Sequence, residues 1–240
     1  MPGDSPRPWL EDYEKFDYRH VWTGKKLEDL SQKRIIREWL RPGQSCLELG
    51  AGFGRVTRVL EPIFVSVVSL ELSKRSLGIA KGRTPKADLS RADIQRIPFR
   101  DSSFDCVVMI RVMHLLPDPR AVMAEVLRVA RDGATIIVSV PNLAVNNLLW
   151  DLKKLATGSA PMGAYVWPYG TRRLVLTPAH FASREFKLES RKGTGLFDNP
   201  LGVLLERVPR LHLLDVATSP FWFAKLDIFM KFKVSKGAGQ

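Results

Sequence analysis

The sequence contains few cysteines and no metal-binding spacing. Its 240 residues include two cysteines, Cys46 and Cys106, and four histidines, and none of these has the spacing of a zinc site. Both cysteines lie in apolar runs, so we expect buried reduced thiols, which are typical of a reducing compartment. The sequence therefore predicts neither a disulfide-rich fold nor a bound metal.

Long hydrophobic runs are missing as well. The longest stretch without charge, residues 133–150, is interrupted by Pro141 and by asparagines, whereas a membrane-spanning helix requires about 20 predominantly apolar residues. The N-terminal residues show no basic segment followed by an apolar one, as a secretion leader would. We therefore expect a soluble, cytoplasmic protein.

Charged residues are frequent, and the excess of basic ones is spread along the chain. The 37 Lys and Arg residues exceed the 25 Asp and Glu residues, for a formal net charge of +12, and no four basic residues are consecutive. Nucleic acid is the less favoured partner because no RNA-binding module is visible. A basic surface that contacts only water is the favoured interpretation, and peripheral contact with an anionic membrane stays an alternative. Nothing in the sequence indicates an oligomeric state.

Short β-rich runs alternate with helical patterns, which is typical of a parallel sheet with crossover helices. We expect an N-terminal arm over residues 1–24 and a single domain over residues 25–240, with an insertion at about 141–171. The expected strands are 45–49, 64–70, 86–92, 104–110, 134–140, 186–191 and 221–234, and the expected helices are 27–40, 53–60, 73–80, 118–131, 143–155 and 177–184.

The most informative segment is a glycine-rich turn after the strand expected at 45–49. Gly50, Gly52 and Gly54 occupy alternate positions, and glycines allow the backbone to turn sharply and to approach a ligand closely. Arg55 stands where the dinucleotide-binding fingerprint needs a further glycine or alanine, so the spacing argues against that fingerprint. Glu48, just before the turn, suits a cationic ligand better than a pyrophosphate.

Acidic residues also end the next two strands. Glu71 lies about 20 residues after Gly50, where a carboxylate can accept the hydroxyls of a ribose. Asp93 ends the third strand. Because the carboxyl ends of parallel strands meet at one edge of a sheet, we expect Glu48, Glu71 and Asp93 to form an acidic site for a cationic ligand.

Together these motifs resemble the class I S-adenosylmethionine-dependent methyltransferases, particularly the small-molecule type 11 group. The resemblance rests on residues 48–54 (ELGAGFG), Glu71, residues 92–93 and residues 104–107, in order and at normal spacing. It implies an α/β, Rossmann-like three-layer sandwich with a seven-stranded, mostly parallel sheet whose last strand is antiparallel. It also implies S-adenosylmethionine as cofactor, with the methionine part on Gly50 and Gly52, the ribose on Glu71 and the adenine between Asp93 and Ile94. The predicted cofactor-binding residues are Glu48, Gly50, Ala51, Gly52, Gly54, Glu71, Leu72, Asp93, Ile94 and Arg111.

In the family that the sequence resembles, the segment after the fourth strand runs beneath the methyl donor. His114 in this segment is a candidate general base for a hydroxyl or amine acceptor, or it only packs beside the cofactor. Arg111 is a candidate to hold an acidic group, or it pairs with a neighbouring acid. A sulfonium donor is already activated, so positioning supplies much of the rate and neither a metal nor a nucleophile triad is required.

Aromatic residues on both sides of this region are candidates for acceptor binding. By the same resemblance, the N-terminal arm folds over the cofactor as a lid, and the insertion builds the acceptor pocket. Apolar side chains in the insertion would suit a lipid or quinone, although packing in the core explains them slightly better. The candidate residues are Tyr18, Trp22, Trp150, Tyr165 and Trp167.

The sequence therefore predicts an enzyme that transfers a methyl group from S-adenosylmethionine to a small organic acceptor. Two alternatives stay open at this point. The acceptor could be RNA, or the chain could be a non-catalytic cofactor-binding protein on the same fold.

Overall fold

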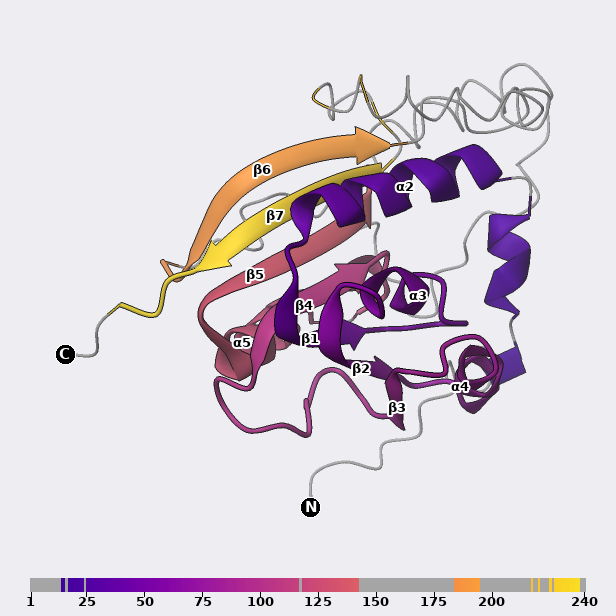
Figure 1. Ribbon diagram of the computed structural model, residues 1–240, viewed down its shortest axis with the longest axis horizontal. Helices are drawn as coiled ribbons and strands as arrows, with labels where there is room; N and C mark the ends of the chain where they lie inside the picture. The colour runs from indigo at the N-terminus through magenta and orange to yellow at the C-terminus, as the bar shows by residue number, and fades with distance from the viewer. Residues whose placement is uncertain are drawn as a thin grey trace.

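A seven-stranded sheet organises the chain (Figure 1). The computed structural model describes residues 14–15, 17–23, 25–116, 118–142, 184–194, 217, 220, 225 and 227–237. Along the sheet the strand order is β3-β2-β1-β4-β5-β7-β6. The strands are β1 (Gly43–Leu49), β2 (Phe64–Glu71), β3 (Asp88–Arg91), β4 (Phe104–Ile110), β5 (Ala130–Pro141), β6 (Phe186–Thr194) and β7 (Asp227–Val234).

One strand runs against the others. All neighbours from β3 to β5 pair in parallel, whereas β7 pairs antiparallel with both β5 and β6. The prediction of a mostly parallel sheet with an antiparallel last strand is therefore confirmed. Asp227, the first residue of β7, pairs with Pro141 at the carboxyl end of β5, so the start of β7 lies at the edge where the parallel strands end.

Helices cover both faces of this sheet, as the three-layer prediction requires. Two apolar clusters define the faces, one including the buried side of α5 and the other the buried sides of α2 and α3, and Figure 1 shows α2 crossing in front of β7. Among the described helices, none has the length and hydrophobicity needed to span a lipid bilayer. The helices are η1 (Tyr18–Trp22, 3-10), α2 (Lys26–Trp39), α3 (Thr57–Leu60), α4 (Lys74–Lys81), η2 (Met113–Leu115, 3-10) and α5 (Pro119–Val129).

Capping residues set the starts of α4 and α5. The Ser73 hydroxyl accepts a hydrogen bond from the Ser76 N–H, and the Asp118 carboxylate accepts from two N–H groups in the first turn of α5, where Pro119 is the first residue. Both residues satisfy backbone donors that a helix start leaves unpaired. The predicted starts of these helices are therefore confirmed.

Other boundaries differ from the predictions. The helix expected over 53–60 begins only at Thr57, because the glycine turn before it uses left-handed backbone that a helix cannot contain. The third strand is shorter than expected, and β5 begins four residues earlier than expected, at Ala130 instead of Ala134. The helices expected at 143–155 and 177–184 and most of the predicted insertion lie outside the described residues.

The central strands are buried on both faces. In β4, Val107 and Met109 join the α5 cluster, while Cys106 and Val108 join the α2 cluster. Cys106 lies opposite Cys46 of β1, and both thiols are buried and free, which confirms the predicted reduced thiols. Burial, together with Cys106, raises the pKa of the Cys46 thiol.

Phe229 provides a test of how β7 is anchored. Its side chain is fully buried, and its ring meets that of Trp39 edge-to-face at 6.5 Å between centroids. We expect Phe229→Ala to lower the free energy of unfolding by about 4 kcal/mol, measured by urea denaturation, since a large apolar side chain leaves a cavity. Val65 is 80% exposed, so Val65→Ala should change that energy by less than about 0.5 kcal/mol. Equal losses in the two variants would contradict this anchoring role.

Candidate functional site

The glycine turn lies at the carboxyl edge of the sheet, between β1 and α3. The N–H groups of Gly50 and Ala51 donate to the Leu70 carbonyl at 2.8 and 3.0 Å, which ties the turn to β2. Gly50, Gly52 and Gly54 have φ values of 76°, 54° and 80°. These values lie in the left-handed region that favours glycine.

Each glycine has a different neighbourhood. A Cβ at Gly50 would lie 2.4 Å from Val112 Cγ2, and one at Gly54 would lie 3.0 Å from Thr84 Cγ2. A Cβ at Gly52 would meet no described atom within 4 Å. Gly50 and Gly54 therefore permit close packing, whereas Gly52 is the position of the turn that faces no neighbour among the described residues.

Glu71 lies fixed against this turn. Its Oε2 accepts a hydrogen bond from the Gly52 N–H at 2.7 Å, and its Oε1 accepts from the N–H groups of Leu72 and Ser73, both at 2.8 Å. The residue is 1% exposed. The structure thus brings Glu71, Leu72 and the central glycine together, as the sequence predicted for the cofactor site.

Glu48 lies beneath the turn. Its Oε2 accepts from the Thr57 hydroxyl at 2.5 Å and from the Ser69 hydroxyl at 2.8 Å, and burial raises its pKa. These bonds join β1 to α3 and β2. The sequence predicted that Glu48 faces a ligand, but its contacts in the structure are with buried hydroxyl groups below the turn. A direct contact of Glu48 with the cofactor stays a prediction.

Asp93 and Ile94 follow β3 at the same edge. The Ala92 N–H donates to the Glu71 carbonyl at 3.2 Å, which brings the ends of β2 and β3 together. Asp93 Oδ1 accepts from the Gln95 N–H at 3.0 Å, and Ile94 belongs to the apolar cluster that includes α5. Their predicted contact with an adenine is compatible with this position and stays a prediction.

The N-terminal arm contacts the site region through Glu14 and Trp22, among other residues. Glu14 accepts hydrogen bonds from the Ser73 hydroxyl and the Lys74 N–H, both at 3.0 Å, at the start of α4. Farther along, the Trp22 ring stacks on the Arg55 guanidinium, 3.6 Å from Cζ to the ring centroid. The arm is therefore docked beside the turn, and its function as a lid stays a prediction.

Of the other predicted acceptor residues, only Tyr18 lies within the described residues, and only its backbone is described. The backbone of Tyr18 begins η1, but its side chain is not described. Trp150, Tyr165 and Trp167 lie outside the described residues.

Arg111 pairs with acids, one of the two alternatives that the sequence left open. Its Nη1 lies 2.7 Å from both carboxylate oxygens of Asp227 and 3.4 Å from Glu28 Oε1. Its backbone adopts a φ of 59°, which is rare for a residue with a side chain. A contact of Arg111 with the cofactor, as predicted, would have to coexist with this ion pair.

His114 lies in η2, after the end of β4. Burial first, and the positive charge of Arg111 second, lower its pKa well below the ordinary value. The imidazole is thus neutral near pH 7, and its low basicity weakens it as a general base. Within the described ranges, no three His, Cys, Asp or Glu side chains are grouped so that they could hold a metal ion.

The sequence analysis missed a buried polar network beside the turn. Glu28 and Gln32 of α2 are 4% and 0% exposed, and Asp227 is fully buried. The available signal was the pair of polar residues at 28 and 32, which share the buried face of α2 with Leu27 and Ile35. Asp227 had no such signal, because it meets Gln32 only through the tertiary fold.

Comparisons with known proteins show that the part of the chain that contains the glycine turn is similar to methyltransferases. Residues 47–138 match a family model described as methyltransferase domain. Curated relatives include a demethylmenaquinone methyltransferase of Renibacterium salmoninarum (33% identical over 98 residues), a probable S-adenosylmethionine-dependent methyltransferase of Mycolicibacterium smegmatis (29% over 100) and a phthiotriol/phenolphthiotriol dimycocerosates methyltransferase of Mycobacterium tuberculosis (36% over 97). These matches cover 41%, 42% and 38% of this chain, and 41%, 39% and 35% of the relatives' own lengths.

A solved structure matches nearly the whole fold. The crystal structure of an S-adenosylmethionine-dependent methyltransferase of Thermotoga maritima, titled a possible histamine N-methyltransferase, aligns with a TM-score of 0.66 at 18% identity and covers 93% of this chain and 98% of that one. Residues 47–138 are therefore a class I methyltransferase domain of the type 11 group, the family that the motifs predicted. The cofactor of this class is S-adenosylmethionine.

The packing of Gly50 on Val112 leads to a stability test. Gly50→Ala combines a left-handed backbone with a Cβ 2.4 Å from Val112, so we expect the free energy of unfolding to fall by about 3 kcal/mol in urea denaturation. Gly133 is a matched control with a φ of 73° and no described atom near its Cβ, and Gly133→Ala should cost only about 1 kcal/mol. A Gly50→Ala loss no larger than the control's would show that the contact is not tight.

Proposed function

We propose that this chain is an S-adenosylmethionine-dependent methyltransferase whose acceptor is a small apolar molecule of the lipid or quinone class. The observation that carries the proposal is the glycine turn. It has an open position at Gly52, directly hydrogen-bonded to the buried Glu71 carboxylate, within a region that matches the methyltransferase domain family.

The described residues fit the donor. Gly52 leaves room for a ligand against the backbone, and Glu71 lies fixed beside it. In the proposed complex the backbone of Gly50 and Gly52 supports the methionine part, Glu71 accepts from the ribose hydroxyls, and Asp93 with Ile94 borders the adenine. When bound, the donor supplies a methyl group that is already activated by attachment to a positively charged sulfur.

The chain's own contribution is then positioning and exclusion of water. Val112 and Gly50 set the floor on which the donor's methionine part rests, and the docked arm with Trp22 covers the adjacent side of the turn. Holding donor and acceptor in line replaces an encounter between two free molecules, which supplies much of the rate. His114, whose pKa is lowered, packs beside the reactants and accepts no proton, and a proton lost by the acceptor leaves to bulk solvent after the transfer.

Three observations support the acceptor class. Relatives aligned over the domain carry names of methyltransferases for demethylmenaquinone and for phthiotriol and phenolphthiotriol dimycocerosates. The apolar and aromatic residues at 148–169 suit such molecules in composition. A formal charge of +12 is also suited to an anionic membrane that holds an apolar acceptor.

Donor binding tests the first part of the proposal. We expect wild-type protein to bind S-adenosylhomocysteine, the demethylated donor, in isothermal titration calorimetry. Gly52→Ala should weaken that binding at least about tenfold, because its Cβ occupies the space against which the donor lies. Gly133→Ala has the same backbone strain away from the turn and should bind as the wild type does. No binding by the wild type, or equal binding by both variants, would contradict the assignment.

Methyl transfer tests the second part. Protein is incubated with methyl-labelled donor and a host extract separated into lipid, small-molecule, RNA and protein pools. We expect label in the lipid pool. Label in the RNA or protein pool alone would overturn the acceptor class, and donor binding without label in any pool would overturn the enzymatic function.

A further inference from the structure

The polar network beside the glycine turn joins four elements that are distant in sequence. Gln32 of α2 donates to Glu28 Oε1 and to Asp227 Oδ2, both at 2.9 Å. Asp227, at the start of β7, holds Nη1 of Arg111, which directly follows β4. The start of β7 is thus bonded directly to the residue that follows β4, and Gln32 and Glu28 tie this pair to the buried face of α2.

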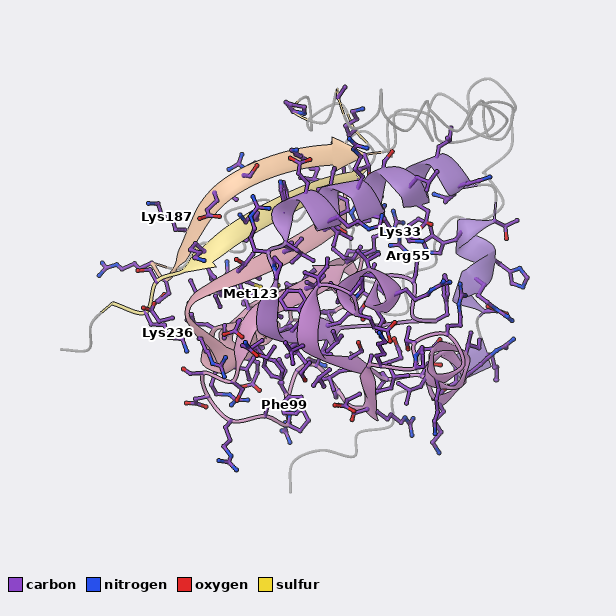
Figure 2. All side chains as sticks on the ribbon, in the orientation of Figure 1. Lys33, Arg55, Phe99, Met123, Lys187 and Lys236 are labelled. Carbon is purple, nitrogen blue, oxygen red and sulfur yellow. The ribbon has the colours of Figure 1, made fainter. Side chains whose placement is uncertain are left out.

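The network also reaches the glycine turn. The Gln32 Oε1 accepts from Arg55 Nη2 at 2.9 Å, and Arg55 Nη1 bonds Asp29 at 2.8 Å. Lys33 bonds the other oxygen of Asp29 at 2.6 Å, and Figure 2 shows Lys33 and Arg55 side by side beneath α2. Arg55 is the residue that follows Gly54, so the network contacts the loop at its C-terminal end.

Arg111 links the polar network to Val112, the residue that packs on Gly50 and that we call the floor of the site. Its N–H donates to the Ser139 carbonyl and hydroxyl, both at 3.1 Å, and its left-handed backbone turns the chain so that Val112 packs on Gly50. A non-glycine residue in this conformation costs free energy and persists only where its surroundings hold it. The guanidinium fixed by Asp227 is one such restraint.

We propose that Asp227 is a positioning residue of the methyl-donor site, which holds the Arg111 guanidinium and thereby fixes Val112 against Gly50 beneath the turn. The inference rests on the proposed function only for the identity of the ligand. Asp227 touches neither cofactor nor substrate in this role. It acts on the donor through the shape of the floor.

Because Asp227 is a titratable group, its interaction with Arg111 depends on pH. Burial raises the pKa of Asp227 to about 7, with Arg111 opposing the rise, Glu28 adding to it and Lys25 opposing it. The carboxylate gains its charge as the pH rises through about 7, so its hold on Arg111 strengthens above that pH and weakens below it. Among the described residues, the charged or titratable groups that face Asp227 or Arg111 are Lys25, which precedes α2, Glu28 of α2, Arg55 after the turn and His114 of η2, and the Gln32 amide also bonds Asp227.

The first variant is Asp227→Asn. We expect its Kd for S-adenosylhomocysteine to rise on the order of tenfold at pH 8, because a displaced floor misaligns the turn. The wild-type Kd should rise as the pH falls from 8 to 6, whereas that of Asp227→Asn should stay nearly constant. Amide hydrogen exchange in residues 111–115 should be faster in the variant than in the wild type.

A double variant separates positioning from stability. Asp227→Leu with Arg111→Met replaces a buried ion pair by apolar side chains, an exchange that often preserves stability. We expect thermal stability near that of the wild type but the same loss of affinity as in Asp227→Asn. Recovery of both stability and affinity would mean that the pair is only structural and would overturn the proposal. This variant also decides the question if Asp227→Asn does not fold.

Glu38→Gln is the matched control. It removes an ion pair that also joins α2 to the last strands, with Lys192 of β6, but on the surface. Affinity and exchange at 111–115 should stay as in the wild type. If hydrogen exchange at 111–115 is unchanged in Asp227→Asn, Asp227 does not fix this segment. If exchange is faster but the affinity for S-adenosylhomocysteine is unchanged, the segment's position does not matter for donor binding. Either result overturns the proposal. Absence of donor binding in the wild type contradicts the proposed function instead, and the exchange data then still show whether Asp227 fixes the floor.

Discussion

The close approach of two backbone segments is the constraint on which the site depends. Gly50 at the end of β1 and Val112 after β4 come so near that a Cβ at Gly50 would lie 2.4 Å from a Val112 methyl group. Adjacent parallel strands bring these segments to the same edge, and two unusual backbone conformations, at Gly50 and at Arg111, allow the contact. Hydrogen bonds fix the backbone on both sides of this contact, from Gly50 to Leu70 and from Arg111 to Ser139.

Much of the fold follows from patterns that are local in sequence. The range of β4 is the one predicted, and that of β2 extends the prediction by one residue, because continuous apolar runs identify strands covered on both faces. Ser73 and Asp118 identify helix starts through the same hydrogen bonds that the structure contains. The start of α3 was wrong, since residue type alone did not show that the left-handed backbone continues to Gly54.

The candidate site was predictable where chemistry coincides with strand ends. Glu71 lies against Gly52 as its place after β2 indicated. Glu48 is buried in β1, whose last four residues are all buried, and only the hydroxyls of Thr57 and Ser69 show why an acid is tolerated there. Asp227 was not predictable, because its partners Gln32 and Arg111 lie 195 and 116 residues away and become neighbours only in the assembled sheet.

The position of β7 has a consequence for biosynthesis. This strand is the last of the sheet to leave the ribosome, yet it lies between β5 and β6 and not at the margin. Until Asp227 has emerged, Arg111 and Gln32 lack a partner that the finished protein supplies. The nascent chain can therefore assemble β1 to β5 early, but the ion pair between Arg111 and Asp227 forms only after β7 has been made.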